Sequence, residues 1–160
     1  MTGIRSSAPV RLHASCVVVG ESGILVRGPA GSGKTTLCLA LLDQASARGR
    51  FARLVADDRT ELRVGHGRLL ACPVPAIAGL VERRGLGHVP DSHEAMACVR
   101  LVVDCQTEGL PRLPEAEDLV TVIAGLTLPR LAIARGAADA GLVLAALALF
   151  GDDMALQCFR

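Results

Sequence analysis

The sequence predicts an α/β fold in which helices flank a central mixed sheet that carries an extra N-terminal β-hairpin. One observation is the glycine-rich segment 28–35, which follows the short apolar run 24–26 and leads into the helix-favouring apolar run 36–42. The other is an N-terminal pair of β-rich runs joined by a glycine-bounded turn. No internal repeat divides the 160 residues, so we expect one domain over residues 1–160.

The glycine-rich segment matches the phosphate-binding P-loop, G-x-x-x-x-G-K-[ST], at every fixed position. Its residues are Gly28, Pro29, Ala30, Gly31, Ser32, Gly33, Lys34 and Thr35. The glycines let backbone N–H groups surround a polyphosphate, and the following helix points its positive end at the same anion. We therefore expect a P-loop nucleotide-binding fold in which ATP contacts this segment and Thr36.

Lys34 is the only lysine in a chain that has 17 Lys and Arg residues. A compact ammonium fits between phosphate oxygens where the planar fork of an arginine does not. We expect Lys34 to reach the β- and γ-phosphates and the Thr35 hydroxyl to bind Mg²⁺.

The N-terminal hairpin is predicted from the β-rich runs 12–19 and 24–27, which the turn 20–23 joins. His13 stands at the start of the first run. A histidine there is either a polar strand-end residue or a group close to the phosphates, and the pattern alone leaves both open.

Two apolar strand candidates end in aspartate. Segment 51–56 precedes Asp57 and Asp58, and segment 99–103 precedes Asp104. Carboxylates at the carboxyl ends of strands in an open α/β sheet face the ligand crevice, where one can orient Mg²⁺ or water and another can accept a hydroxyl proton. The pattern does not choose between the Asp57 and Asp58 pair and Asp104 as the Walker-B-like acid.

A charged and glycine-rich segment, 82–89, begins with Glu82, Arg83 and Arg84. We expect an exposed loop that can flex over the site and offer a hard oxygen ligand and a cation to the γ-phosphoryl group. Segment 90–95, which has Asp and Ser in capping positions, predicts a short helical turn.

The rest of the chain predicts mainly sheet. Segment 60–72 alternates like a second hairpin, and the Pro- and acid-rich segment 106–118 reads as a loop that contains Arg112. The last elements expected are strands at 119–124 and 131–134 and an Ala/Leu-rich helix at 138–150.

Composition limits the partners and the compartment. The net charge is +1, and the chain has three Phe but no Trp or Tyr, so we expect no nucleic-acid partner. The longest uncharged apolar run, 140–150, is too short to span a bilayer, and residues 1–10 lack the apolar core of a leader. The six cysteines form no C-x-x-C pair, so we expect a cytoplasmic protein without a membrane partner.

Taken together, these motifs resemble the catalytic domain of the bacterial HPr kinase/phosphorylase family, from Leu12 to about Ala145. Family members are similar in a histidine-started hairpin, a P-loop, a V-A-D-D strand end and an E-x-R-G-x-G loop. In this sequence those elements are His13, 28–35, Val55-Ala56-Asp57-Asp58 and Glu82-Arg83-Arg84-Gly85-Leu86-Gly87. The last two, in this order, are the more specific ones.

The resemblance implies a role for each matching residue. Asp58 would be the base that takes the proton from a substrate serine, and His13, Lys34 and Arg112 match active-site positions. Mg²⁺ would be held by Thr35 and Glu82, with Asp57 beside them. Arg84 would join Lys34 around the γ-phosphate, because phosphoryl transfer depends on positioning and charge.

The resemblance therefore implies an ATP-dependent serine kinase that acts on HPr or an HPr-like phosphocarrier and forms a homo-oligomer. Because the hairpin begins at residue 12, we expect the catalytic domain without a separate N-terminal domain. Of the family's R-P-G-R-N-like segment, associated with the phosphorylase direction, segment 134–139 keeps only Arg135 and Gly136. We expect the kinase direction and leave the phosphorylase direction and the family's hexamer open.

Other P-loop classes fit less well. A GTPase needs N-K-x-D and hence a second lysine, and an ABC-type ATPase needs an L-S-G-G-Q-like signature, which the chain lacks. A small-molecule kinase and an ATP-binding regulatory module stay open as alternatives.

Overall fold

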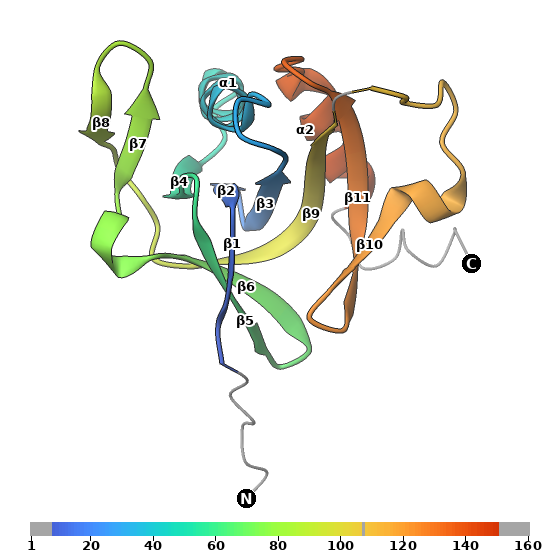
Figure 1. Cartoon of the computed structure of the whole chain (residues 1–160), viewed down its shortest axis with the longest axis horizontal. Helices are drawn as coiled ribbons and strands as arrows, with labels where there is room; N and C mark the ends of the chain where they lie inside the picture. The colour runs from blue at the N-terminus through green and yellow to red at the C-terminus, as the bar shows by residue number, and fades with distance from the viewer. Residues whose placement is uncertain (1–7, 107, 151–160) are drawn as a thin grey trace, which may run out of the picture.

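The structure is a computed structural model that describes residues 8–106 and 108–150 (Figure 1). Its helices are α1 (Lys34–Ala47) and α2 (Ala140–Phe150), with single 3-10 turns at Pro75–Ile77 and Ala116–Leu119. The strands are β1 (Val10–Leu12), β2 (Ala14–Val19), β3 (Ser22–Arg27), β4 (Ala52–Ala56), β5 (Thr60–Gly65), β6 (Arg68–Pro73), β7 (Leu80–Arg83), β8 (Gly87–Pro90), β9 (Ala97–Gln106), β10 (Val120–Ile123) and β11 (Leu126–Ala134).

Nine of these strands form one mixed sheet. Its order is β1-β5-β6-β9-β3-β2-β4, and β11 and β10 extend it from the other edge of β9. The strands β3, β9 and β11 run parallel, whereas β2 pairs antiparallel with both β3 and β4. The mixed sheet, the two helices and the β2–β3 hairpin confirm the α/β fold class.

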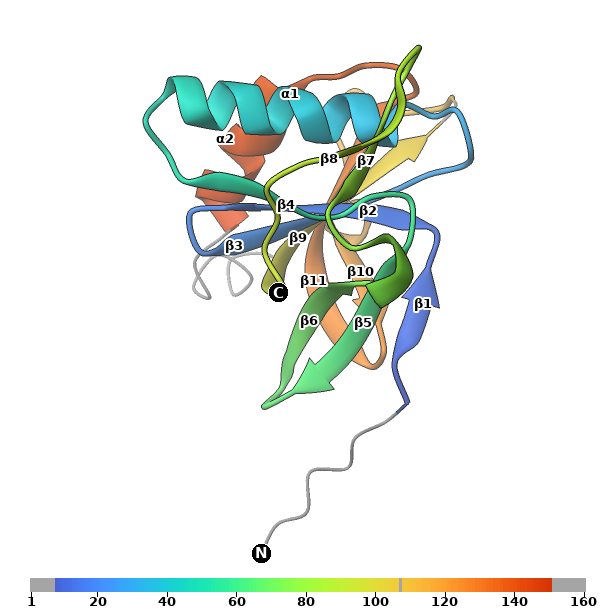
Figure 2. The same ribbon diagram turned by 90° about the vertical axis from the view of Figure 1, so that its left-hand side faces the viewer.

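The two faces of the sheet are covered differently. Figure 2 shows α1 and α2 above the central strands, with the β5–β6 hairpin below them. The first core cluster joins the helices to residues of β2, β3 and β9, and the second packs the opposite face against β5, β6 and β11. All six residues of β2 are buried because both of its faces are covered.

Helix α1 begins directly after the P-loop. Gly33 precedes it with φ +93°, a left-handed conformation that glycine adopts without strain. Leu37, Leu41 and Ala45 recur at four-residue spacing and bury one face of α1 on the sheet. The chain therefore enters the helix with its backbone N–H groups turned toward the carboxyl end of β3.

Two local predictions are wrong. Segment 82–89 is not a loop, because β7 and β8 pair antiparallel and leave only a tight turn at their tip. Segment 90–95 forms no helical turn, because it runs extended against the edge of β4. There His93 bridges Leu54, and the Glu94 N–H donates to the Leu54 carbonyl at 2.8 Å.

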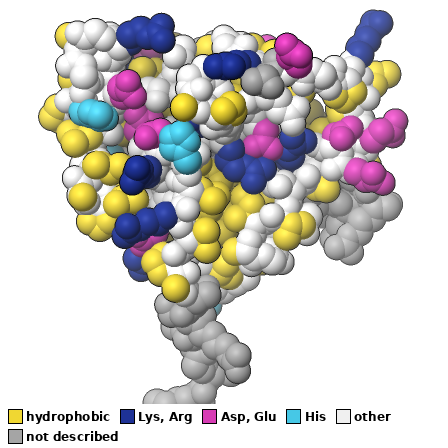
Figure 3. Space-filling model, viewed as in Figure 1, with side chains coloured by type: hydrophobic (Ala, Val, Ile, Leu, Met, Phe, Trp, Pro, Cys, Tyr) yellow, Lys and Arg dark blue, Asp and Glu magenta, His cyan; other side chains and the backbone are white. Residues whose placement is uncertain are grey.

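The surface mixes charges of both signs. On the face drawn in Figure 3, basic, acidic and histidine side chains are interspersed above a more hydrophobic region. Within the part of the chain that the structure describes, no helix is both long enough and apolar enough to cross a membrane.

Candidate active site

The P-loop joins β3 to α1 through a closely packed turn. A Cβ added to Gly28 would lie 2.5 Å from Ser32 Oγ and 2.9 Å from the Cys105 carbonyl oxygen, so no other residue fits there. Gly31 and Gly33 have φ of +73° and +93°. The motif therefore has glycine where a side chain would clash or strain the backbone, as a loop that wraps phosphate requires.

Lys34 lies folded back over this loop. Its Nζ donates to the carbonyl oxygens of Gly28 at 3.1 Å and Pro29 at 3.2 Å. Lys34 is only 6% exposed, so its ammonium is held at the mouth of the loop rather than left in solvent. The position fits a cation that contacts phosphate oxygens.

Asp57, at the end of β4, is a buried carboxylate with three neutral donors. Its Oδ1 accepts from Ser15 Oγ at 2.8 Å and from Thr35 Oγ1 at 2.9 Å, and its Oδ2 accepts from the Glu82 backbone N–H at 2.9 Å. Asp57 thus ties β4 to the β2 strand, to the first turn of α1 and to the β7–β8 hairpin. Hydroxyl and amide donors orient the carboxylate and leave its charge uncompensated.

Asp58 is the next residue and points elsewhere. Its φ is +62°, and its Oδ1 lies 2.5 Å from His13 Nε2. The side chains of His13 and Asp58 are 48% and 52% exposed, so the pair faces an open space. A carboxylate held against an imidazole in this way is arranged to accept a proton from a group entering that space.

One cavity, of about 790 Å³, unites most of the predicted site. Figure 2 shows why: the β7–β8 hairpin rises beside the end of α1 that follows the P-loop. The candidate residues that line the cavity are His13, Ala30, Gly31, Gly33, Lys34, Thr35, Thr36, Asp58, Glu82 and Arg84. Segments far apart in sequence therefore converge on the P-loop.

The remaining predicted residues lie outside the cavity lining. Ser32 and Asp57 are buried, whereas the half-buried Gly28 and the exposed Pro29 line a separate pocket beside Asp104. Arg112 is exposed in the segment between β9 and β10 and does not line the cavity.

Asp104, the competing acid near the end of β9, forms ion pairs with two arginines. Its carboxylate accepts from Arg27 at 2.8 and 2.9 Å and from Arg130 Nε at 2.5 Å. Burial acts to raise the pKa of Asp104, but the hydrogen bonds and charges of Arg27 and Arg130 outweigh it and hold the pKa below its ordinary value. The geometry therefore favours Asp57 and Asp58 as the candidate acids.

Three neighbours of the site were missed from the sequence. Ser15 contacts both aspartates, Arg135 Nε donates to the Gly31 carbonyl at 3.4 Å, and the Gly136 N–H donates to the Ser32 carbonyl at 3.1 Å. A weak signal existed for Ser15, because it stands two residues after His13 and alternate strand residues share a face. The sequence indicates Arg135 and Gly136 only as the remnant of the family's R-P-G-R-N-like segment, and not for a contact with the P-loop.

A divalent cation fits the donors beside Thr35. Mg²⁺ is usually held by one or two carboxylates together with substrate phosphates, and Thr35, Asp57 and Glu82 supply hard oxygen atoms near the P-loop. Among the described residues, no group of three or more His, Cys, Asp or Glu side chains forms a metal cage. The donor set therefore fits a cation that arrives with a nucleotide.

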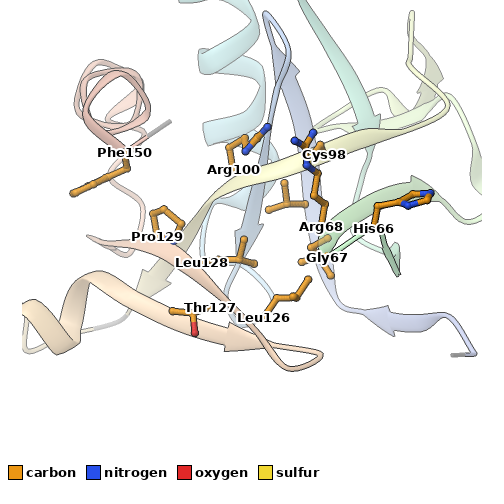
Figure 4. Close-up of a pocket in the computed structure, with 12 residues that line it drawn as sticks. His66, Gly67, Arg68, Cys98, Arg100, Leu126, Thr127, Leu128, Pro129 and Phe150 are labelled. Atoms are coloured by element: carbon orange, nitrogen blue, oxygen red, sulfur yellow. The ribbon is translucent and has the colours of Figure 1, made fainter. Parts of the chain in front are cut away.

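A second cavity, of about 260 Å³, is separate from this site (Figure 4). It lies between the β5–β6 turn, β9 and the β10–β11 hairpin, and Arg68, Arg100, Leu126, Leu128 and Phe150 line it. It shares no lining residue with the P-loop cavity, so none of the candidate residues belongs to it.

Comparison with known proteins finds similar proteins by sequence and by structure. No family model matches the chain. The chain is 39% identical over 77 residues to the HPr kinase/phosphorylase of Clostridium tetani, covering 48% of this chain and 23% of that protein. It is 42% identical over 86 residues to the HPr kinase/phosphorylase of Xanthomonas campestris pv. campestris, covering 52% of this chain and 25% of that protein.

A solved structure extends the likeness to most of the chain. The HPr(Ser) kinase/phosphatase of Coxiella burnetii superposes with a TM-score of 0.68 and 25% sequence identity, covering 87% of this chain and 88% of that one. The chain is thus similar to proteins named HPr kinase/phosphorylase over about half of its sequence and over most of its fold. The sequence matches to HPr kinase/phosphorylase relatives span about a quarter of those proteins. The comparisons support the predicted resemblance to this family and confirm the P-loop fold.

Proposed function

We propose that the chain is an ATP-dependent kinase that phosphorylates a serine of HPr or of an HPr-like phosphocarrier, with Mg²⁺ at the P-loop. The proposal is supported by the similarity to proteins that carry the name HPr kinase/phosphorylase. The single observation that carries it is the cavity in which Lys34, Asp58 and Glu82 meet. These residues come from three separate segments, which the hydrogen bonds of Asp57 hold together.

Asp58 is the proposed base. In the transfer step the serine oxygen forms a bond to the γ-phosphorus, the bond from that phosphorus to the bridging oxygen of ADP breaks, and Asp58 takes the hydroxyl proton. His13, 2.5 Å away, holds the Asp58 carboxylate in place. The half-exposed position of this pair lets a serine on another protein reach it.

Residues on two sides of the cavity would stabilise the negative charges of the transferred phosphoryl group. Lys34 and the amides at the start of α1 approach from the P-loop, and Arg84 approaches from the β7–β8 turn. Thr35, Asp57 and Glu82 would hold Mg²⁺. When bound, the cation neutralises the β- and γ-phosphate oxygens and favours departure of the ADP oxygen.

Three parts of the proposal rest on the resemblance alone. The first is that Arg112 reaches the site only in the complex with the acceptor protein, since it is exposed and outside the cavity lining. The second is a homo-oligomer, which sedimentation velocity tests. The third is the direction of the reaction: the proposal covers the kinase direction and makes no claim for the phosphorylase direction.

The proposal is tested by incubating purified protein with Mg-ATP and a purified HPr and detecting phosphoserine by mass spectrometry. We expect phosphorylation by the wild type, a loss of about 10³-fold or more for Asp58→Asn with nucleotide binding kept, and a loss of both for Lys34→Ala. Asp43→Asn is the matched control, because Asp43 is exposed on α1 and does not line the cavity.

Each outcome has a separate meaning. Transfer at the wild-type rate by Asp58→Asn would remove Asp58 as the base. Nucleotide binding without any phosphoserine on HPr would remove the proposed acceptor and favour a small-molecule kinase or a regulatory module.

A further inference from the structure

Ser15 joins the two aspartates through one oxygen atom. Its Oγ donates to Asp57 Oδ1 at 2.8 Å and accepts from the Asp58 backbone N–H at 3.0 Å. Ser15 is fully buried in β2, so neither hydrogen bond competes with solvent. A single hydroxyl thus fixes the side chain of one aspartate and the backbone of the next.

The backbone that Ser15 holds is a strained one. Asp58 has φ +62°, in the left-handed region that residues with a Cβ adopt at a cost in free energy. The turn also contains the Arg59 N–H, which donates to the Asp57 carbonyl at 2.7 Å. Strain of this kind persists only where surrounding contacts determine it, and the Ser15 hydroxyl is one such contact.

A β-bulge brings Ser15 to this position. In the β2–β4 pair, Cys16 is opposite Ala56 but Val17 is opposite Leu54, so β4 carries one extra residue, Val55. Bulges next to functional sites redirect the residues that follow them. Here the shift leaves Ser15, the residue before Cys16, next to the aspartates that follow Ala56.

We propose that Ser15 is a positioning residue that sets the geometry of Asp57 and Asp58 together, an inference that rests on the proposed kinase function. Without its hydroxyl, the Asp58 N–H loses its acceptor and Asp57 keeps only Thr35 Oγ1 and the Glu82 N–H as donors. The left-handed turn then relaxes, and the Asp58 carboxylate leaves the place where it accepts the serine proton.

The contacts that hold Lys34 and begin α1 do not involve Ser15. Lys34 is held by the carbonyls of Gly28 and Pro29, and the first helical bond of α1 runs from the Leu37 N–H to the Gly33 carbonyl at 2.9 Å. Asp57 also keeps its hydrogen bond from Thr35 when the Ser15 hydroxyl is lost. We therefore expect the loss to fall mainly on the rate of transfer and to change nucleotide binding little. A merely structural role for Ser15 would not separate kcat from KM in this way.

Steady-state kinetics with Mg-ATP and HPr test the proposal. We expect Ser15→Ala to lower kcat about 10- to 100-fold, the cost of a lost hydrogen bond to a charged group, while KM for ATP stays within about threefold. Ser15→Thr keeps the hydroxyl and restores most of kcat. Thr60→Val is the matched control, because the buried Thr60 hydroxyl donates to the Ala14 carbonyl at 2.8 Å and contacts neither aspartate.

Hydrogen exchange by NMR gives a measurement that needs no activity. The Asp58 amide should be protected in the wild type and in Thr60→Val, and should exchange at least about tenfold faster in Ser15→Ala. Unchanged Asp58 protection, unchanged kcat in Ser15→Ala, or an equal loss of kcat in Thr60→Val would each overturn the positioning role. If the wild type makes no phosphoserine, the kinase proposal fails while the exchange data still decide whether Ser15 holds the turn.

Discussion

The ends of β4 and β9 both carry an aspartate next to the P-loop, but their surroundings differ. Asp57 accepts hydrogen bonds from two hydroxyls and one backbone amide, all of them neutral. Asp104 accepts from Arg27 and Arg130, both of them cations. The charge of Asp57 is not neutralised by these partners, whereas the charge of Asp104 is balanced by ion pairs with two arginines.

The difference teaches that the partners of a strand-end acid, more than the strand itself, decide what the acid can do. Arg27 stands directly before Gly28, so the ion-paired cluster at the end of β9 fixes the point where the chain enters the P-loop. At the end of β4, by contrast, Asp58 lines the P-loop cavity. Four predictions test this difference, in order of decreasing expected effect.

Asp57→Asn should lower kcat for phosphate transfer by about 10²- to 10³-fold, because it removes a negative charge that is proposed to help hold Mg²⁺ beside Thr35. The free energy of unfolding should fall by only about 1–3 kcal/mol, because the amide oxygen still accepts from the two hydroxyls while its NH2 group replaces the acceptor of the Glu82 N–H. Transfer assays and urea denaturation measure the two effects. A kcat within a factor of three of the wild type would contradict the account of β4.

Asp104→Asn should show the opposite profile. It leaves Arg27 and Arg130 facing each other with side chains that are 27% and 16% exposed, so we expect a loss of roughly 2–4 kcal/mol in the free energy of unfolding. The kcat of the folded variant should fall by less than about tenfold, since Asp104 touches no transferred atom. If Asp104→Asn instead abolished transfer without a loss of stability, the two strand ends would have exchanged roles.

The stability contributed by Asp104 should depend on pH in a defined direction. The folded pKa of Asp104 lies below its ordinary value of 3.8, because hydrogen bonds from Arg27 and Arg130 outweigh burial. The unfolded chain therefore binds the proton first, and the contribution is complete above about pH 5 and is lost as the pH falls through the folded pKa. Urea denaturation of wild type and Asp104→Asn from pH 7 to pH 3 should show curves that converge in acid. A difference in the free energy of unfolding that stayed constant with pH would mean that the ion pairs of Asp104 do not stabilise the fold.

Glu82→Gln should have the smallest effect. The Glu82 side chain is exposed, and its contact with Asp57 is made by the backbone N–H, which the substitution keeps. We expect the Mg²⁺ concentration for half-maximal rate to rise about 5- to 10-fold, with stability unchanged. Rates measured over a Mg²⁺ titration test this, and Glu21→Gln is the control, because Glu21 is exposed and does not line the cavity. An unchanged Mg²⁺ dependence would remove Glu82 from the ligands.

Much of the fold could be predicted from the sequence because its signals are local. The P-loop spacing, the glycine-bounded hairpin and the apolar α2 helix each follow from residues that are neighbours in the chain. The β7–β8 hairpin could not be predicted, because its strands are short and its charged, glycine-rich composition also suits a loop. Segment 90–95 was mispredicted because a tertiary pairing with Leu54 overrode its capping residues.

Only part of the candidate site could be predicted from the sequence. Lys34, Thr35 and Asp58 stand in motifs whose spacing carries meaning, and the cavity unites them. The sequence could not choose between Asp57 and Asp104, because the choice depends on the ion pair that Asp104 makes with Arg130. Arg130 is 26 residues from Asp104 in the chain. Ser15 acts through contacts 42 and 43 residues away, and no local pattern encodes such a distance.

The central claim is that the cation and the transferred phosphate lie at the end of β4 and not at the end of β9. The most direct measurement is a crystal structure with a non-hydrolysable ATP analogue and Mn²⁺ in place of Mg²⁺, located by its anomalous scattering. The account predicts a single strong anomalous peak beside Thr35 Oγ1 and Asp57, with Asp104 still bound to Arg27 and Arg130. A peak beside Asp104, or a nucleotide whose phosphates lie away from Lys34 and Asp58, would contradict it.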